Sequence, residues 1–253
     1  MAIEFGLTPD SRRDIDAASL VAAAAGAGFS AVGMAGRQAD AASAAALADA
    51  GLRCHELLAL VVGPDEESTL SQARLLAEAA ATVRAQWVLT TFLVPLDAAT
   101  AGLIRQCAAL FAAAGAGMAV EFSPLGAVPS IAAALAVAEA AGAGRAGVLI
   151  DSWHFLLGDP AWEQLKQVPL DQIAYVQFAD APPPVSPNMM REAMHRRALP
   201  GAGTLDLRRF AATLLDRGWS GLVSAEILSA ELRTRPAPEF AGQAYQATAR
   251  YWQ

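Results

Sequence analysis

The chain has 253 residues, of which 55% are hydrophobic and 17% are charged, and this composition excludes an intrinsically disordered protein. The formal net charge of -7 argues against a nucleic-acid partner, because nucleic-acid-binding proteins usually present a basic face. Cys54 and Cys107 form no CxxC pair, which excludes a zinc ribbon or a redox motif. We therefore expect a cytoplasmic protein with a small-molecule substrate and no nucleic-acid or membrane partner. A homo-oligomer is compatible with these features.

The segment from Ala17 to Gly36 carries no charge and follows Arg12 and Arg13, which gives it a crude likeness to a twin-arginine signal or a membrane span. It is mainly Ala and Gly rather than Leu, Ile and Phe. Asp14 and Asp16 also stand where a signal would avoid acidic residues. We expect a helix followed by a strand, in a soluble protein.

A recurring junction organises the chain: an Ala-rich helical stretch ends in glycine, and a β-rich run follows at once. Glycine is favoured directly after a helix because it adopts the left-handed conformation without a Cβ clash. The junctions run from Gly26 to Val32, Gly51 to Val62, Gly115 to Phe122, Gly142 to Ile150 and Gly218 to Leu228.

Short apolar runs, each followed by a helical stretch, predict eight buried parallel strands. The predicted strands are Ile3 to Leu7, Ser30 to Met34, Cys54 to Val61, Trp87 to Leu93, Met118 to Phe122, Val148 to Asp151, Ile173 to Phe178 and Leu222 to Ile227. Intervening helices such as Asp65 to Val83 and Asp97 to Ala114 open with Asp, a favoured capping residue. Eight strand-helix units predict an α/β fold, the (β/α)8 TIM barrel, as a single domain over residues 1–253.

A doubly wound sheet is the main alternative, because it is built from the same strand-helix units. That fold usually carries G-x-G-x-x-G directly after its first strand. Here the first predicted strand runs into Thr8, Pro9 and Asp10 without a glycine, and Gly26 and Gly28 precede a strand instead of following one. The sequence therefore favours the closed barrel.

Four consecutive predicted strands each present an oxygen-bearing side chain near the C-terminal end, where TIM barrels carry their reactive groups. These residues are Glu121, Asp151, Gln177 and Glu226. Any one of them could be a solvated residue where a strand frays. Three converging carboxylates, however, repel one another unless they are protonated or neutralised. We expect the four residues to ligate one divalent cation, and their oxygen atoms favour Mn²⁺ or Mg²⁺.

These positions resemble the xylose isomerase-like barrels, a family that includes sugar and sugar-phosphate isomerases and epimerases. In that family, strands five to eight supply Glu, Asp, His or Gln, and Glu to one divalent metal, so the resemblance implies the same four ligands. Asp151 and His154 match the family's Asp-x-x-His motif. Gln at position 177 in place of His is similar to the hydroxypyruvate isomerase and 3-dehydroshikimate dehydratase branches.

The segment from Arg191 to Gly203 resembles the E-x-R-H-x-R-x-x-P-G-x-G loop of those branches, in which the final Arg and the neighbouring His reach substrate. The resemblance implies that His195 and Arg197 contact substrate. His154, after the sixth strand, and His55, on the third, are two further candidates for substrate binding.

The resemblance and the expected metal site imply an enzyme, a divalent-metal-dependent isomerase or epimerase of a small sugar or polyhydroxy carbonyl compound. Glu121 and Glu226 would be the catalytic acid and base that transfer the α-proton, through an enediolate held by the metal. A lyase similar to 3-dehydroshikimate dehydratase is the alternative. Met194 and Ala202 replace polar residues of the dehydratase-like loop, which favours isomerisation. A non-catalytic sugar-binding barrel is the alternative of another class.

Overall fold

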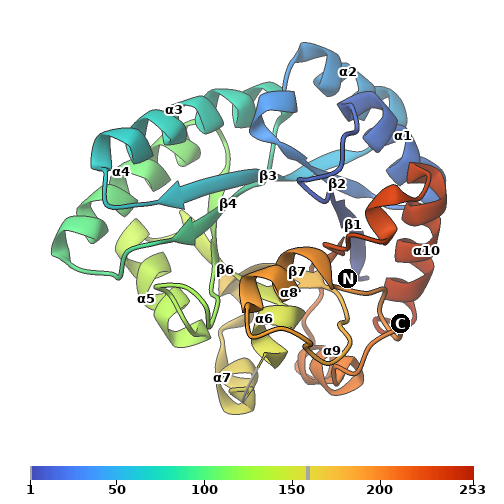
Figure 1. Cartoon of the computed structure of the whole chain (residues 1–253). Coiled ribbons are helices and arrows are strands. Elements are labelled where there is room, and N and C mark those ends of the chain that lie inside the picture. Colours follow the sequence, from blue (N-terminus) through green and yellow to red (C-terminus); the bar gives the residue numbers. More distant parts are fainter. Residues whose placement is uncertain (1, 158–159) are drawn as a thin grey trace.

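The computed structural model of this chain describes residues 2–157 and 160–253, and its centre is a closed barrel of parallel strands in the order β1 to β8 (Figure 1). The strands are β1 (Glu4–Thr8), β2 (Ala31–Ala35), β3 (Arg53–Val62), β4 (Trp87–Phe92), β5 (Gly117–Glu121), β6 (Ala146–Asp151), β7 (Ile173–Phe178) and β8 (Leu222–Glu226). Parallel pairing of β1 with β8, from Glu4 opposite Leu222 to Thr8 opposite Glu226, closes the barrel. The predicted (β/α)8 fold is confirmed.

Helices surround the barrel on its outer side, and α1 and α10 pack against each other where the beginning and the end of the chain meet (Figure 1). The helices are α1 (Ala17–Ala27), α2 (Ala41–Ala50), α3 (Glu66–Val83), α4 (Ala98–Ala113), α5 (Ile131–Ala141), α6 (Ser152–Leu156), α7 (Trp162–Gln167), α8 (Met189–His195), α9 (Leu207–Leu215) and α10 (Ala237–Ala249). The described residues also form three short 3-10 helices: η1 (Gly36–Gln38), η2 (Leu170–Gln172) and η3 (Leu232–Thr234). Every predicted strand matches an observed strand to within two residues at each end.

Aspartate side chains begin the first four helices of the barrel, as the sequence predicts for α3 and α4. Each carboxylate accepts a hydrogen bond from the backbone N–H three residues later, which satisfies one of the unpaired donors of the first turn. The capping residues are Asp16, Asp40, Asp65 and Asp97. The uncharged segment after Arg13 is thus the capped helix α1 followed by β2.

The glycine that ends α1 is Gly28, two residues after the predicted Gly26. Gly26 lies inside the helix, and Gly28 takes the left-handed conformation with φ 97°. The N–H groups of Gly28 and Phe29 donate to the carbonyls of Ala25 and Ala24, and the Phe29 ring is buried against the core. This pairing needs a buried apolar residue directly after the glycine, and Phe29 provides it for Gly28.

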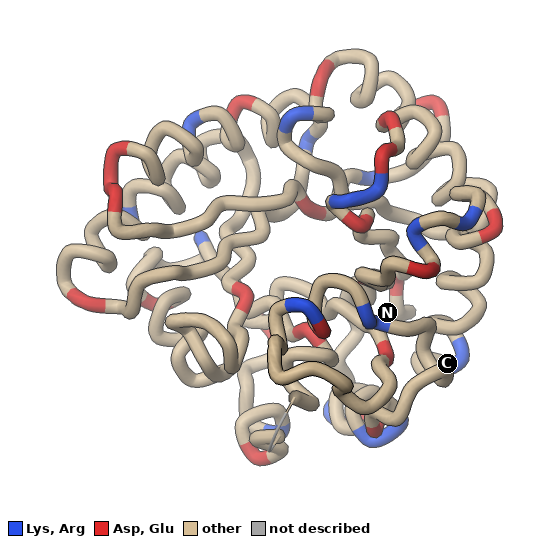
Figure 2. The backbone as a smooth tube through the Cα atoms, in the orientation of Figure 1, with Lys and Arg blue, Asp and Glu red and all other residues tan. Residues whose placement is uncertain are grey.

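Charged residues lie mainly on the outer helices and loops, and a few acidic residues lie on strands around the barrel centre (Figure 2). Across the residues that the structure describes, no helix is long and apolar enough to cross a membrane.

The two glycines of α1 should respond oppositely to alanine. Gly26→Ala should raise the free energy of unfolding by about 0.5–1 kcal/mol, because Gly26 is helical and a Cβ there meets nothing within 4 Å. Gly28→Ala should lower it by about 1–2 kcal/mol, because a Cβ is strained at positive φ. Urea denaturation of the matched pair measures both values. Equal stability of the two variants would contradict the assigned cap.

Candidate active site

The strand alternation points the predicted acids into the barrel. Strands β4 to β7 each contribute one residue to a small apolar cluster: Leu89, Ala119, Leu149 and Tyr175. Glu121, Asp151 and Gln177 each lie two positions beyond a member of this cluster, so they face the same way. Asp151 and Gln177 are direct partners in the pairing of β6 with β7, and Glu226 ends β8. The C-terminal end of the barrel therefore gathers all four side chains.

Three of the neighbouring side chains approach closely enough to hold one metal ion. Glu121, Asp151 and His154 each offer a ligand atom, and these atoms lie within 4.8 Å of one another. His154 Nε2 is 3.6 Å from Glu121 Oε1 and 4.0 Å from Asp151 Oδ2. The backbone N–H groups of Trp153 and His154 donate to Asp151 Oδ1, which starts α6 and explains the Asp-x-x-His spacing.

Gln177 offers a further oxygen. Its side chain has no exposed surface, and its Nε2 lies 3.3 Å from Glu56 Oε2. Among the described residues, no group hydrogen-bonds to Gln177 Oε1. A buried carbonyl oxygen without a partner is unfavourable in a protein interior, and a bound cation would satisfy it. The donor set of carboxylates, amide oxygen and imidazole fits a divalent metal.

Arg197 joins two of the acids. Its Nη1 donates to Asp151 Oδ2 and to Glu226 Oε2, each at 2.7 Å, and its guanidinium lies over the Trp153 ring. The side chain is only 3% exposed. The resemblance implied a substrate contact for Arg197, and the structure places it first against two barrel carboxylates. The substrate contact of Arg197 stays a prediction.

Burial and mutual repulsion shift the titration of the acids. Burial, with the neighbouring Asp151 charge, raises the pKa of Glu121 to about 8. Burial also raises the pKa of Glu226 well above its usual value, although Arg197 opposes the shift. For Asp151, burial raises the pKa, but Arg197 and His154 outweigh it and hold the pKa below the usual range. Burial lowers the pKa of His154 to about 4, so its imidazole is neutral at pH 7 and free to bind a metal.

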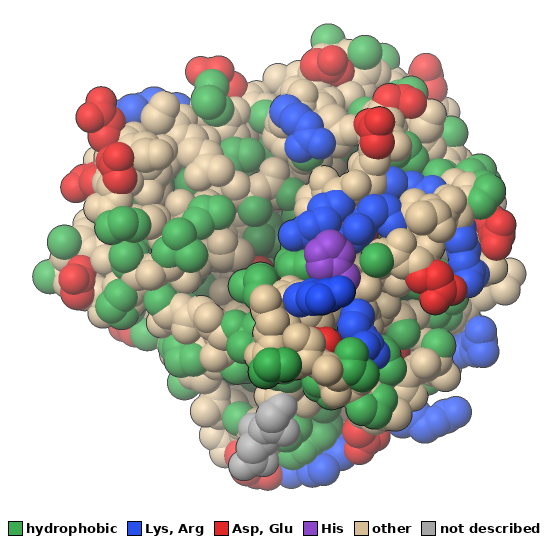
Figure 3. Space-filling model, viewed as in Figure 1, with side chains coloured by type: hydrophobic (Ala, Val, Ile, Leu, Met, Phe, Trp, Pro, Cys, Tyr) green, Lys and Arg blue, Asp and Glu red, His purple; other side chains and the backbone are tan. Residues whose placement is uncertain are grey.

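A cavity of about 550 Å³ opens above these groups. Glu121, His154, Arg197 and Glu226 line it, while the side formed by β3, β4 and the segment after β5 is apolar: Leu58, Val61, Leu89, Phe92, Leu93, Leu125 and Val128. Figure 3 shows hydrophobic side chains on one side of the hollowed face and Lys and Arg side chains on the other. The cavity can therefore hold a polar group at the acids and a carbon skeleton against the opposite wall.

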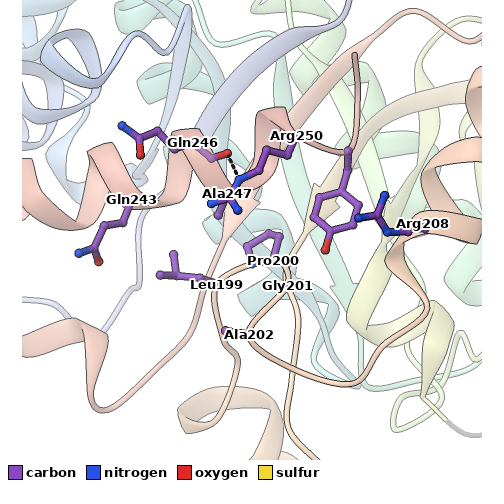
Figure 4. A pocket seen from close by; sticks show the side chains of 10 residues that line it. Leu199, Pro200, Gly201, Ala202, Arg208, Gln243, Gln246, Ala247 and Arg250 are labelled. Carbon is purple, nitrogen blue, oxygen red and sulfur yellow. Dashed lines mark hydrogen bonds between the residues drawn. The ribbon is translucent and has the colours of Figure 1, made fainter.

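A second cavity, of about 320 Å³, lies between α10 and the loop that follows Pro200 (Figure 4). Its polar side chains come from Arg208, Gln243, Gln246, Arg250 and Tyr251. The described residues that line it include no carboxylate and none of the metal-ligating, catalytic or substrate-binding residues predicted from the sequence. We therefore assign the candidate active site to the larger cavity at the barrel end.

Asp180, which the sequence analysis did not single out, fixes the loop that carries Arg197. Its carboxylate accepts hydrogen bonds from the backbone N–H groups of Gly201, Gly203 and Leu205. Its backbone exchanges two hydrogen bonds with Ala198. The signal was present in the sequence as an acid directly after an apolar strand, followed by the glycines of the loop.

The two other predicted substrate contacts are not part of the cavity lining. The described residues that line it include neither His195 nor His55. His195 ends α8 and is partly exposed, whereas His55 has no exposed surface and contacts Glu56, with 3.2 Å between Nε2 and Oε1. Their roles as substrate contacts stay predictions.

Metal affinity should increase with pH up to about 8. Below that pH the Glu121 carboxyl holds a proton that a cation must displace, because burial raises its pKa to about 8. The apparent affinity for Mn²⁺ should therefore rise from pH 6 to pH 8 and level off above. Titration calorimetry in two buffers of different ionisation enthalpy measures the affinity and the protons released. An affinity that is flat over this range would contradict the shifted pKa.

Arg197→Ala should destabilise the metal-free protein by about 3–5 kcal/mol at neutral pH, because it leaves two buried carboxylates without their cation. Arg196→Ala is the matched control in the same loop, and it should cost about 1 kcal/mol or less because its pair with Glu192 is partly exposed. Mn²⁺ should recover part of the loss in Arg197→Ala only. Urea denaturation with and without Mn²⁺ measures each value, and equal losses in both variants would show that Arg197 is not the counter-charge.

The chain is similar to known proteins in both sequence and structure. The family model described as xylose isomerase-like TIM barrel matches residues 21–251. The structure of an IolI protein with a binding zinc atom superposes with a TM-score of 0.85 at 17% identity, covering 98% of both chains. A D-allulose 3-epimerase from Methylomonas sp. gives a TM-score of 0.77 at 18% identity, covering 99% of this chain and 100% of the other.

Among curated proteins, a 3-dehydroshikimate dehydratase from Pseudomonas putida is 37% identical over 92 residues. The matched segment covers 36% of this chain and 14% of that enzyme. The structural neighbours share the fold, and the family model covers nearly the whole barrel with its acids. The chain belongs to the xylose isomerase-like TIM-barrel family.

Proposed function

We propose that this chain is a divalent-metal-dependent isomerase or epimerase of a small polyhydroxy carbonyl compound. The observation that carries the proposal is the pair Glu121 and Glu226, because both line the cavity and both have raised pKa values. A carboxyl group whose pKa lies near neutral pH exchanges protons efficiently in either direction. The pKa of Glu226 at the same cavity is also raised by burial, and two carboxyl groups there suit removal and return of a proton.

Glu121, Asp151, Gln177 and Glu226 would hold the ion, and His154 is a further candidate ligand. The oxygen-rich set favours Mn²⁺ or Mg²⁺, and the zinc atom bound by the IolI neighbour supports a metal-binding role for this chain. When bound, the ion would polarise the substrate carbonyl and hydroxyl and so acidify the adjacent carbon.

The chain's own groups would divide the proton transfer. One glutamate, when ionised, would take the α-proton, and the other, when protonated, would return a proton to the neighbouring or the same carbon. Arg197 holds Glu226 through Oε2, which fixes the carboxylate in place. The neutral His154 imidazole lines the same cavity and can hydrogen-bond a substrate hydroxyl.

Dehydration is the second candidate. Two observations favour it: the sequence relative from Pseudomonas putida is a 3-dehydroshikimate dehydratase, and the apolar side of the cavity suits a ring of carbon atoms. Arg37, which also lines the cavity, could meet a carboxylate on such a substrate. Dehydration begins with the same proton removal and then expels hydroxide, so the same glutamates would serve it.

Turnover in D₂O separates these outcomes. An isomerase or epimerase should place solvent deuterium on a substrate or product carbon, because a protein carboxyl group exchanges with solvent before it returns the proton. Mass spectrometry of Mn²⁺-loaded protein with a panel of ketoses, inosose-like ketones and dehydroshikimate measures the label. Glu226→Gln is the control and should reduce incorporation by about 10²–10⁴-fold.

A rise in ultraviolet absorbance with dehydroshikimate, and no deuterium label in any ketose, would show that the chain catalyses dehydration instead of isomerisation. Binding of a ketose without label or product would instead support a non-catalytic sugar-binding barrel.

A further inference from the structure

A buried polar network lies in the barrel next to Gln177, and Glu56 on β3 is its centre. Its carboxylate accepts hydrogen bonds from the Thr8 hydroxyl, the Tyr175 hydroxyl and the Gln177 amide, and it contacts His55. These five side chains come from β1, β3 and β7, and each is at most 1% exposed. A carboxylate with this many donors is held in one place.

The strands next to β3 leave room for this carboxylate. A Cβ on Gly33 of β2 would lie 2.7 Å from Glu56 Oε1, and a Cβ on Gly6 of β1 would lie 3.1 Å from the His55 ring. The pairing of β2 with β3 also passes from Cys54 to Glu56 and skips His55. This bulge brings two consecutive residues of β3 into the buried network.

The network determines how the Gln177 amide is turned. An ionised carboxylate accepts hydrogen bonds and donates none, so the amide must face Glu56 with its NH₂ group. The carbonyl oxygen then faces away from Glu56, and it is the buried atom that finds no hydrogen-bond partner among the described residues. If the amide turned over, two oxygen atoms would meet and the NH₂ group would face the metal ligands.

We propose that Glu56 is a positioning residue for the metal site, because it orients the Gln177 amide so that Oε1 becomes a ligand atom. This inference rests on the proposed metal site and adds a residue that does not touch the metal. It also restricts position 177: a Gln or a His can donate to Glu56 and ligate with its other atom, whereas a Glu there would turn an oxygen toward the Glu56 carboxylate.

An isosteric charge exchange tests the proposal. Gln177→Glu adds a negative ligand, which by charge alone should tighten Mn²⁺ binding. We expect it to weaken binding by about tenfold or more, because the new carboxylate faces Glu56. The double variant Glu56→Gln with Gln177→Glu restores one donor and one acceptor, and its affinity should return to within about threefold of the wild-type value.

The measurements are Mn²⁺ dissociation constants, obtained from the electron paramagnetic resonance of free Mn²⁺, with circular dichroism to confirm that each variant is folded. Glu192→Gln, combined with Gln177→Glu, is the matched control, because it removes another buried carboxylate that pairs with Arg196 instead. This control should not rescue binding. If Glu56 has only a structural role, Glu56→Gln should lower stability equally with Gln or Glu at position 177. It would then not restore Mn²⁺ affinity either.

The proposal is supported if Glu56→Gln restores Mn²⁺ affinity in the Gln177→Glu background and Glu192→Gln does not. Additive losses in the double variant, or tighter binding by Gln177→Glu in the wild-type background, would overturn it while leaving the metal site in place. Absence of Mn²⁺ binding by the wild-type protein would overturn both this inference and the proposed metal-dependent function.

Discussion

The structure depends on how negative charge is balanced inside the barrel. Within one closed sheet, Asp151 and Glu56 have no exposed surface, and the side chains of Glu226 and Glu121 are only 9% and 11% exposed. A buried carboxylate is stable only when it is paired, hydrogen-bonded or protonated. Here each solution occurs: Arg197 neutralises two acids, donors from three strands surround Glu56, and Glu121 has a pKa raised to about 8. Because the carboxyl groups are stabilised in different ways, their pKa values differ, and this difference suits acid-base chemistry.

The loop after β7 serves this balance. Arg197 stands between backbone hydrogen bonds that tie its segment to both neighbouring strands: its own N–H donates to Leu228, after β8, and Ala198 pairs with Asp180, after β7. These backbone hydrogen bonds fix the position of the Arg197 main chain, and so they help to hold the guanidinium against the acids. Asp180 is essential to that arrangement although it has no place in the cavity lining.

The strands and the acids could be predicted from the sequence because both follow from periodicity: apolar runs end in a polar residue, and parallel strands end at the same rim. The positions of Gly26 and His55 could not. The end of α1 depended on where Phe29 packs, and the orientation of β3 depended on a bulge that a count of alternating residues does not detect. Glu56 was missed for the same reason, since its importance lies in contacts with Thr8 and Tyr175 across the barrel.

The attachment of the loop at Asp180 has a consequence for how this protein can change over evolutionary time. The apolar residues that the α8 segment presents to the cavity, Met190 and Met194, stand outside both the buried acids and the Asp180 hydrogen bonds. Met190 is 58% exposed, so substitutions there can reshape the cavity entrance while the barrel keeps its charge balance and its stability. The shape of the cavity entrance can therefore change over time by neutral substitutions that leave the interior intact.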